Sequence, residues 1–161
     1  MKKNQGFTII ELIIFITLLS TILVVAASYV TRLLYNMTTN EHRVKARFYA
    51  EEVVEWLNGE RQSDWQAFQN EASVAGTVYC LNGTISLDTL LQDLTPGACS
   101  GTNNGYVGVG NRAPKIFKRE LTLTKNTASN ATQVTARITV SWVDRDIEYS
   151  VPIETIYSIY E

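Results

Sequence analysis

Residues 7–31 read FTIIELIIFITLLSTILVVAASYVT, and this stretch sets the architecture of the 161-residue chain. Its only charged side chain is Glu11, and the run from Leu12 to Thr31 carries no charge at all. A helix of about 20 apolar residues is long enough to cross the hydrocarbon core of a membrane. We therefore expect residues 7–31 to form a membrane-length helix that anchors the rest of the chain.

Glu11 lies inside this apolar stretch, about one helical turn from its start. A charge within a membrane span costs about 3 kcal/mol or more unless a partner neutralises it. Two explanations are open. Either Glu11 marks the membrane surface and the span begins at Leu12, or Glu11 has a cationic partner on another subunit, such as the N-terminal ammonium group of a neighbouring chain.

The composition argues against nucleic-acid binding, metal sites and catalysis. The formal net charge of −2 does not indicate a strongly basic surface for nucleic acid. A zinc site needs about four ligands, but His42 is the only histidine and the chain has two cysteines. A nucleophile activated by histidine would have to use His42, which lies between Glu41 and Arg43. We interpret His42 as a solvated helix residue and expect no catalytic residue, metal or cofactor.

One long helix is predicted, because no glycine or proline occurs between Phe7 and Asn58. The pair Asn58-Gly59 is a typical stop, since glycine readily takes the left-handed cap conformation. We expect the second half of this helix, residues 32–58, to be amphipathic and to pack on a globular head, residues 59–161. Its apolar residues at helical spacing are Val44, Phe48, Ala50, Val53, Val54 and Leu57.

The head, residues 59–161, is expected to contain a small antiparallel sheet. Apolar and polar residues alternate over 116–125, 134–143 and 147–153, which predicts three consecutive strands with one apolar face. Pro152 indicates that the last strand either lies at a sheet edge or is irregular at that point, since proline cannot donate to a ladder. The fold class is therefore α+β, with the helix packed on an antiparallel sheet.

Shorter signals precede these strands. Ser63 and Asp64 are good N-cap residues for a short helix, and residues 88–94 are expected to include a helical turn. Asn82-Gly83 lies between two β-like segments, residues 78–81 and 84–87, and this pattern predicts a hairpin.

Cys80 and Cys99 lie in the part of the chain that the N-terminal segment would export. An oxidising compartment makes a disulfide between them plausible, and two free thiols are the alternative. The glycine- and asparagine-rich segment 95–114 is expected to be a surface loop. It is either a solvated connector or a surface for a partner, whose possible contacts are Asn103, Asn104, Tyr106 and Arg112.

The N-terminus combines a short basic leader, a glycine and the glutamate-bearing apolar stretch, KKNQGFTIIEL over residues 2–12. This pattern resembles the class III signal of type IV prepilins and pseudopilins. The resemblance implies a pilin-like fold. It also implies that a prepilin peptidase removes the leader, residues 1–6, by cutting between Gly6 and Phe7, that Phe7 is then N-methylated, and that Glu11 acts in assembly.

The same resemblance implies a location and partners. The protein would be a single-pass membrane protein of a bacterial or archaeal-like cell envelope, and after assembly it would belong to an extracellular pilus or a periplasmic pseudopilus. Its expected partners are the prepilin peptidase, other pilin or pseudopilin subunits through helix–helix packing, an inner-membrane assembly platform, and membrane lipid before assembly.

Two further segments, ARFYAEEVVEWL at 46–57 and VSWVD at 140–144 with YSV at 149–151, are similar to a subset of this family. The subset comprises the minor pilins called pilus-modification proteins and the I-type minor pseudopilins. The leading interpretation is a minor pilin that initiates a pilus, sits at its tip or mediates adhesion. The alternatives are a minor pseudopilin of a type II secretion or DNA-uptake (competence) machine, and a membrane-anchored binding module without a filament.

Overall fold

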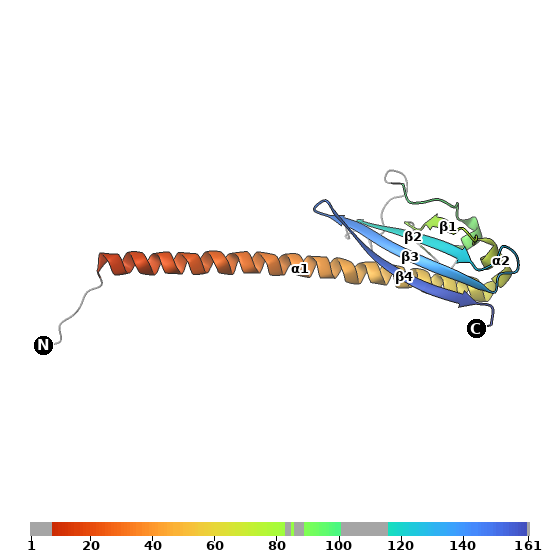
Figure 1. Ribbon diagram of the computed structural model, residues 1–161, viewed down its shortest axis with the longest axis horizontal. Helices are drawn as coiled ribbons and strands as arrows, with labels where there is room; N and C mark the ends of the chain where they lie inside the picture. Colours follow the sequence, from red (N-terminus) through yellow and green to blue (C-terminus); the bar gives the residue numbers. More distant parts are fainter. Residues whose placement is uncertain (1–7, 83–84, 86–88, 101–115, 161) are drawn as a thin grey trace. The chain divides into compact units, whose positions relative to one another are not determined.

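The computed structural model describes four parts of the chain, residues 8–82, 85, 89–100 and 116–160 (Figure 1). A long helix comes first and a small antiparallel sheet follows, which confirms the α+β class. The chain divides into two compact units, Met1–His42 and Arg43–Glu161. Helix α1 (Ile9–Ser63) contributes to both units. The leader and the division of the helix at residue 31 stay predictions.

In the first unit, α1 contains a stretch that is long and apolar enough to cross a membrane, and none of that stretch is buried. Its hydroxyl side chains bond within the helix, because each donates to a carbonyl oxygen of the preceding turn. Because each hydroxyl has a hydrogen-bond partner within the helix, it can be placed in an apolar environment without losing its hydrogen bond. These hydroxyls belong to Thr17, Ser20, Thr21, Ser28 and Thr31.

The predicted end of the helix at Asn58-Gly59 is wrong, because α1 continues through Gly59 to Ser63. Tertiary contacts hold the added turn in place. A Glu60 side-chain oxygen accepts a hydrogen bond from the Leu91 backbone N–H at 3.0 Å, and Arg61 donates to the Ser158 carbonyl at 3.5 Å. These contacts with distant segments outweigh the local tendency of glycine to end a helix.

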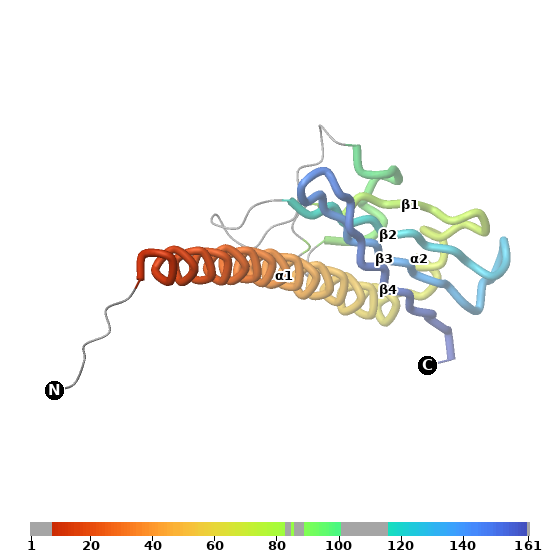
Figure 2. Tube along the Cα trace, turned by 60° about the vertical axis from the view of Figure 1, so that its left-hand side comes forward, coloured from red at the N-terminus to blue at the C-terminus, as the bar shows by residue number. Residues whose placement is uncertain are grey.

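The second unit contains a four-stranded sheet in the order β1-β2-β3-β4, in which every neighbouring pair is antiparallel (Figures 1 and 2). The three predicted strands are confirmed as β2 (Phe117–Lys125), β3 (Gln133–Asp144) and β4 (Ile147–Ser158). Arg145 and Asp146 join β3 to β4 with φ of 50° and 64°, the geometry of a tight hairpin turn. Pro152 lies on β4, which is an edge strand, the first of the two alternatives.

The core of the second unit lies between α1 and one face of the sheet. Ala46, Ala50, Val53 and Leu57 are completely buried on the helix. They belong to one hydrophobic cluster with the inward residues of β3, which are Val134, Ala136, Ile138, Val140 and Trp142.

The predicted apolar face of α1 is therefore wrong for two of its members. Val44 and Phe48 are 70% and 61% exposed. The buried face is instead the side that carries Ala46 and Ala50, which belong to one hydrophobic cluster with the inward residues of the sheet. Val44 and Phe48 lie on the opposite side of the helix, because residues about two positions from the buried ones project away from the core at about 100° per residue.

The hairpin predicted between residues 78–81 and 84–87 is also wrong, because the first of these segments has a different partner. β1 (Thr77–Cys80) pairs with β2, and its other edge is bridged by Pro96 through Tyr79. Ile85 belongs to no strand, while the remaining residues of segment 84–87 lie outside the described residues. The bond between Cys80 and Cys99 draws the segment around Pro96 to this edge, a long-range constraint that turn propensity does not contain.

The short helices are confirmed. α2 (Trp65–Asn70) begins after Asp64, whose carboxylate accepts a hydrogen bond from the Ala67 backbone N–H at 3.0 Å. The helical turn expected within 88–94 is the 3-10 helix η1 (Leu91–Asp93). Both lie beside the end of α1, since Glu60 contacts Leu91 and α2 follows α1 directly.

Candidate functional site

The first unit presents a helix whose large apolar side chains are exposed to the surroundings. Apolar patches of this size mark surfaces that meet a membrane or another protein. Their exposure to water would be unfavourable, and the length and composition of this helix fit a membrane anchor. The exposed residues from Ile9 to Tyr29 include Ile10, Leu12, Ile13, Ile14, Phe15, Ile16, Leu18, Leu19, Ile22, Leu23, Val24 and Val25.

Glu11 lies in the first turn of α1 and is exposed in the single chain. Its backbone N–H donates to the Thr8 hydroxyl at 3.4 Å, and the Leu12 N–H donates to the Thr8 carbonyl at 3.2 Å. Thr8 is therefore the N-cap of α1, and Thr8-x-x-Glu11 has the spacing of a capping box. A carboxylate in this first turn also complements the positive end of the helix dipole.

The role of Thr8 was not predicted, although the Thr-x-x-Glu spacing in the sequence signals it. The cap fixes the residue at which the helix begins. It therefore also fixes the position of the Glu11 carboxylate along the helix axis. Gly6 and Phe7, the predicted cleavage and methylation positions, lie outside the described residues.

A buried arginine, Arg119 of β2, ties the head together and was also not predicted. Its side chain is 1% exposed. Its Nε donates to the Leu81 carbonyl at 2.9 Å and its terminal nitrogen donates to the Tyr49 carbonyl at 3.1 Å. The same nitrogen pairs with the Glu52 carboxylate at 2.5 Å. One guanidinium thus joins α1, β2 and the segment that follows β1.

Burial lowers the pKa of Arg119 from its usual value, and the hydrogen bond and charge of Glu52 oppose that shift. The guanidinium remains charged, since its ordinary pKa is far above neutral pH. The signal for this residue was the apolar alternation of Phe117, Leu121 and Leu123, in which Arg119 occupies an inward position. Which residue would neutralise it could not be read from β2 alone.

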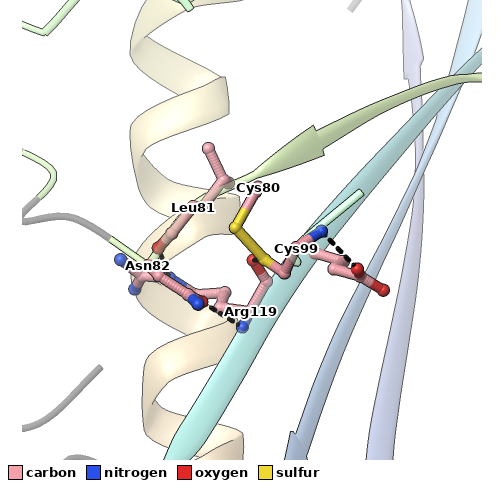
Figure 3. The surroundings of a disulfide bond; sticks show 6 residues. Cys80, Leu81, Asn82, Cys99 and Arg119 are labelled. Carbon is pink, nitrogen blue, oxygen red and sulfur yellow. Dashed lines mark hydrogen bonds between the residues drawn. A yellow bond between two sulfur atoms is a disulfide. The ribbon is translucent and has the colours of Figure 1, made fainter. Parts of the chain in front are cut away.

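Cys80 and Cys99 form a disulfide, with a Cα–Cα distance of 4.8 Å (Figure 3). Figure 3 shows the bond beside Arg119, whose backbone N–H donates to the Asn82 side-chain oxygen at 2.8 Å. The Cys99 N–H also donates to the Glu120 carboxylate at 2.8 Å. The disulfide and these hydrogen bonds fix both ends of the segment between the two cysteines. The predicted partner contacts Asn103, Asn104, Tyr106 and Arg112 lie outside the described residues.

A cavity of about 230 Å³ lies between the end of α1, α2 and η1, and three carboxylates line it. Each of them already supports the fold. Glu60 holds Leu91, Asp64 caps α2, and Glu71 accepts a hydrogen bond from the Tyr79 hydroxyl at 2.9 Å. Burial and Glu71 raise the pKa of Tyr79.

No group of three or more potential metal ligands occurs among the residues that the structure describes. His42 lies in α1 and is half-buried, so the interpretation of a fully solvated side chain is corrected.

The comparisons with known proteins concern the N-terminus. Residues 1–27 match the family model described as the prokaryotic N-terminal methylation motif. No curated protein and no solved structure matched the chain. The matched segment covers Thr8, Glu11 and most of the exposed apolar stretch of α1.

Proposed function

We propose that this chain, whose methylation motif supports membership of the type IV pilin and pseudopilin family, is a minor pilin. The motif implies processing by a prepilin peptidase and assembly with pilin-type subunits. Together with the apolar helix it fits a membrane-anchored protein of a prokaryotic envelope. The family motif suggests a structural subunit and not an enzyme. The minor role is initiation of the pilus, a place at its tip, or contact with a surface.

The observation that carries the proposal is the continuity between the motif and the exposed helix. Residues 1–27 match the motif, and α1 extends the same apolar surface as one uninterrupted helix from Ile9. Such a surface is stable in lipid before assembly and among other apolar helices after it, because both environments remove the side chains from water. The hydroxyls that bond within the helix suit both environments.

Cleavage between Gly6 and Phe7 would create a new ammonium group, and methylation of Phe7 would keep its charge. In a packed filament Glu11 would be buried, and an unpaired buried carboxylate is costly. The Phe7 ammonium of a neighbouring subunit neutralises it in only one axial position. We assign Glu11 this role of setting the register between subunits, a use known for other buried polar groups.

The choice of a minor pilin is supported by the head. The segment 46–57 supplies the helix side of the core, and Trp142 of β3 stacks on Tyr149 of β4 with ring centroids 5.5 Å apart. These are the segments that resemble the pilus-modification subset. The disulfide suits a head outside the reducing cytoplasm.

Immunoelectron microscopy of sheared filaments tests the proposal, with a Glu11→Val variant beside the natural chain. The natural chain should be cleaved after Gly6 and found in filaments, at few positions or at the tip. Glu11→Val should be inserted and cleaved but lost from filaments. The matched control is Thr17→Val, which removes a hydroxyl that bonds only to the Ile14 carbonyl of its own helix.

Normal incorporation of Glu11→Val would refute the role of Glu11. Absence of the natural chain from sheared filaments, with label confined to the periplasm, would favour the pseudopilin alternative. Failure of the peptidase to cut after Gly6 would favour a membrane-anchored binding module.

A further inference from the structure

The segment between the two cysteines packs against α1 as well as against the sheet. We name its described residues the strap: 81–82, 85 and 89–98. Leu81 and Leu91 of the strap are 3% and 1% exposed, and they belong to the same hydrophobic cluster as Leu57 of α1. The strap therefore forms part of the core around the helix.

Two hydrogen bonds join the strap directly to the last turns of α1. The Trp56 indole N–H donates to the Thr89 carbonyl at 2.9 Å. The Leu91 backbone N–H donates to a Glu60 carboxylate oxygen at 3.0 Å. Trp56 also packs against the hydrophobic cluster, so the strap supports this end of the helix through both polar and apolar contacts.

A third link between the strap and α1 runs through Arg119 of β2. The Leu81 carbonyl accepts a hydrogen bond from Arg119 Nε at 2.9 Å, while the Leu81 N–H donates to the Arg119 carbonyl at 2.8 Å. The same guanidinium donates to the Tyr49 carbonyl and pairs with the Glu52 carboxylate on α1. From Tyr49 to Glu60 the three links cover about 16 Å of helix, at about 1.5 Å per residue.

The disulfide joins the two ends of the strap at one place beside Arg119 (Figure 3). The Cys99 sulfur lies 3.5 Å from the Arg119 carbonyl oxygen, the same oxygen that accepts from Leu81. With its ends joined, the strap gains little conformational freedom when it leaves the helix. Without the bond the open strap gains much more, so its contacts with α1 are then opposed by a larger entropy.

We propose that the Cys80–Cys99 bond is a redox switch that controls how firmly the strap holds the second half of α1. When the bond forms, two electrons and two protons pass from the two thiols to an external disulfide, which becomes two thiols. A thiol–disulfide oxidoreductase is the class of partner that supplies such a disulfide. Reduction reverses the step, opens the strap and loosens residues 49–60 of α1. The switch belongs to the fold of this chain and does not require a filament.

Hydrogen exchange of the full chain in detergent, read by mass spectrometry, tests the switch. Reduction of the folded protein should speed exchange of strap amides such as Leu91 and Gly97 by up to about a hundredfold, the factor expected for a bond that closes a loop of this length. Amides of α1 over 49–60 should also exchange faster, whereas those of β3, held between β2 and β4, should not. A chain with Cys80→Ala and Cys99→Ala should behave like the reduced protein.

The redox equilibrium tests the role of Arg119, because coupling between two events is reciprocal. Arg119→Lys keeps the charge but loses the forked geometry that joins Leu81 to Tyr49. In a glutathione buffer its ratio of oxidised to reduced protein should fall at least about fivefold. The matched control is Arg137→Lys, which changes an exposed arginine that pairs with Glu154 on the outer face of the sheet, and it should leave the ratio unchanged.

The proposal is overturned if reduction leaves the exchange of the strap and α1 unchanged, since the packing would then hold without the bond. It is also overturned if β3 speeds up as much as the strap, because that result describes loss of the whole head. An unchanged ratio for Arg119→Lys would contradict the link through this arginine. Should the chain without cysteines fail to fold, reduction of the natural chain, which starts folded, decides. Since none of these measurements involves a filament, they are independent of the microscopy that tests the proposed function.

Discussion

Replacement of Glu52 by glutamine should destabilise the head far more than the same change at its neighbour Glu51. Both carboxylates pair with an arginine, at 2.5 Å for Glu52 and 2.8 Å for Glu51. Arg119, the partner of Glu52, is 1% exposed, whereas Arg47, the partner of Glu51, is 71% exposed. In Glu52→Gln the guanidinium therefore stays buried with only neutral acceptors.

The magnitude follows from burial. Removing one partner of a fully buried ion pair costs about 3–5 kcal/mol, because the other charge is left uncompensated. The Glu52 side chain is itself 40% exposed, so water screens the pair and can replace part of the carboxylate. We therefore expect Glu52→Gln to lower the free energy of unfolding by about 1–2 kcal/mol. Glu51→Gln should lower it by less than about 0.5 kcal/mol.

Urea unfolding of the full chain in detergent measures both values. The three tryptophans, Trp56, Trp65 and Trp142, all lie in the second unit, so their fluorescence reports on the head. The transition midpoint should fall for Glu52→Gln with an unchanged denaturant slope. Equal shifts for the two variants, or no shift for Glu52→Gln, would refute the argument that Arg119 requires a charged partner.

Two further results are expected, the first from the same urea unfolding and the second from circular dichroism as the pH is raised. Gly59→Ala should raise the free energy of unfolding by up to about 1 kcal/mol, since Gly59 is helical and an added Cβ meets nothing within 4 Å; a loss of stability would instead indicate a left-handed stop. Burial raises the pKa of Tyr157 to about 12 from the ordinary value of 10.0. The neutral hydroxyl is thus favoured by folding, so its contribution is complete below about pH 10, and about 2 kcal/mol is lost as the pH rises to about 12. Circular dichroism should show this loss, and Tyr157→Phe should reduce it.

Many elements of this fold could be predicted because their signals are local. The alternation in β3 from Val134 to Trp142 matches its buried face residue for residue. Asp64 caps α2 because its side chain reaches an N–H only three residues ahead. The motif at the N-terminus was recognisable for the same reason, since Thr8, Glu11 and the apolar stretch are contiguous in the chain.

The wrong predictions concern residues whose state depends on distant partners. Gly59 remains helical because Glu60 and Arg61 are held by segments far along the chain. Phe48 is exposed because the sheet packs on a different side of α1.

The amino-acid order alone determined the membrane-length helix with Glu11 in its first turn, the three C-terminal strands and the family of the N-terminal motif. All of these rest on periodicity or on contiguous residues. Only the tertiary structure decided that Arg119 and Glu52 form a buried pair, that Pro96 completes the edge of β1, and that Val44 and Phe48 face outward. The physical reason is that burial and charge compensation depend on which segments meet in space, and such meetings join residues that no local pattern connects.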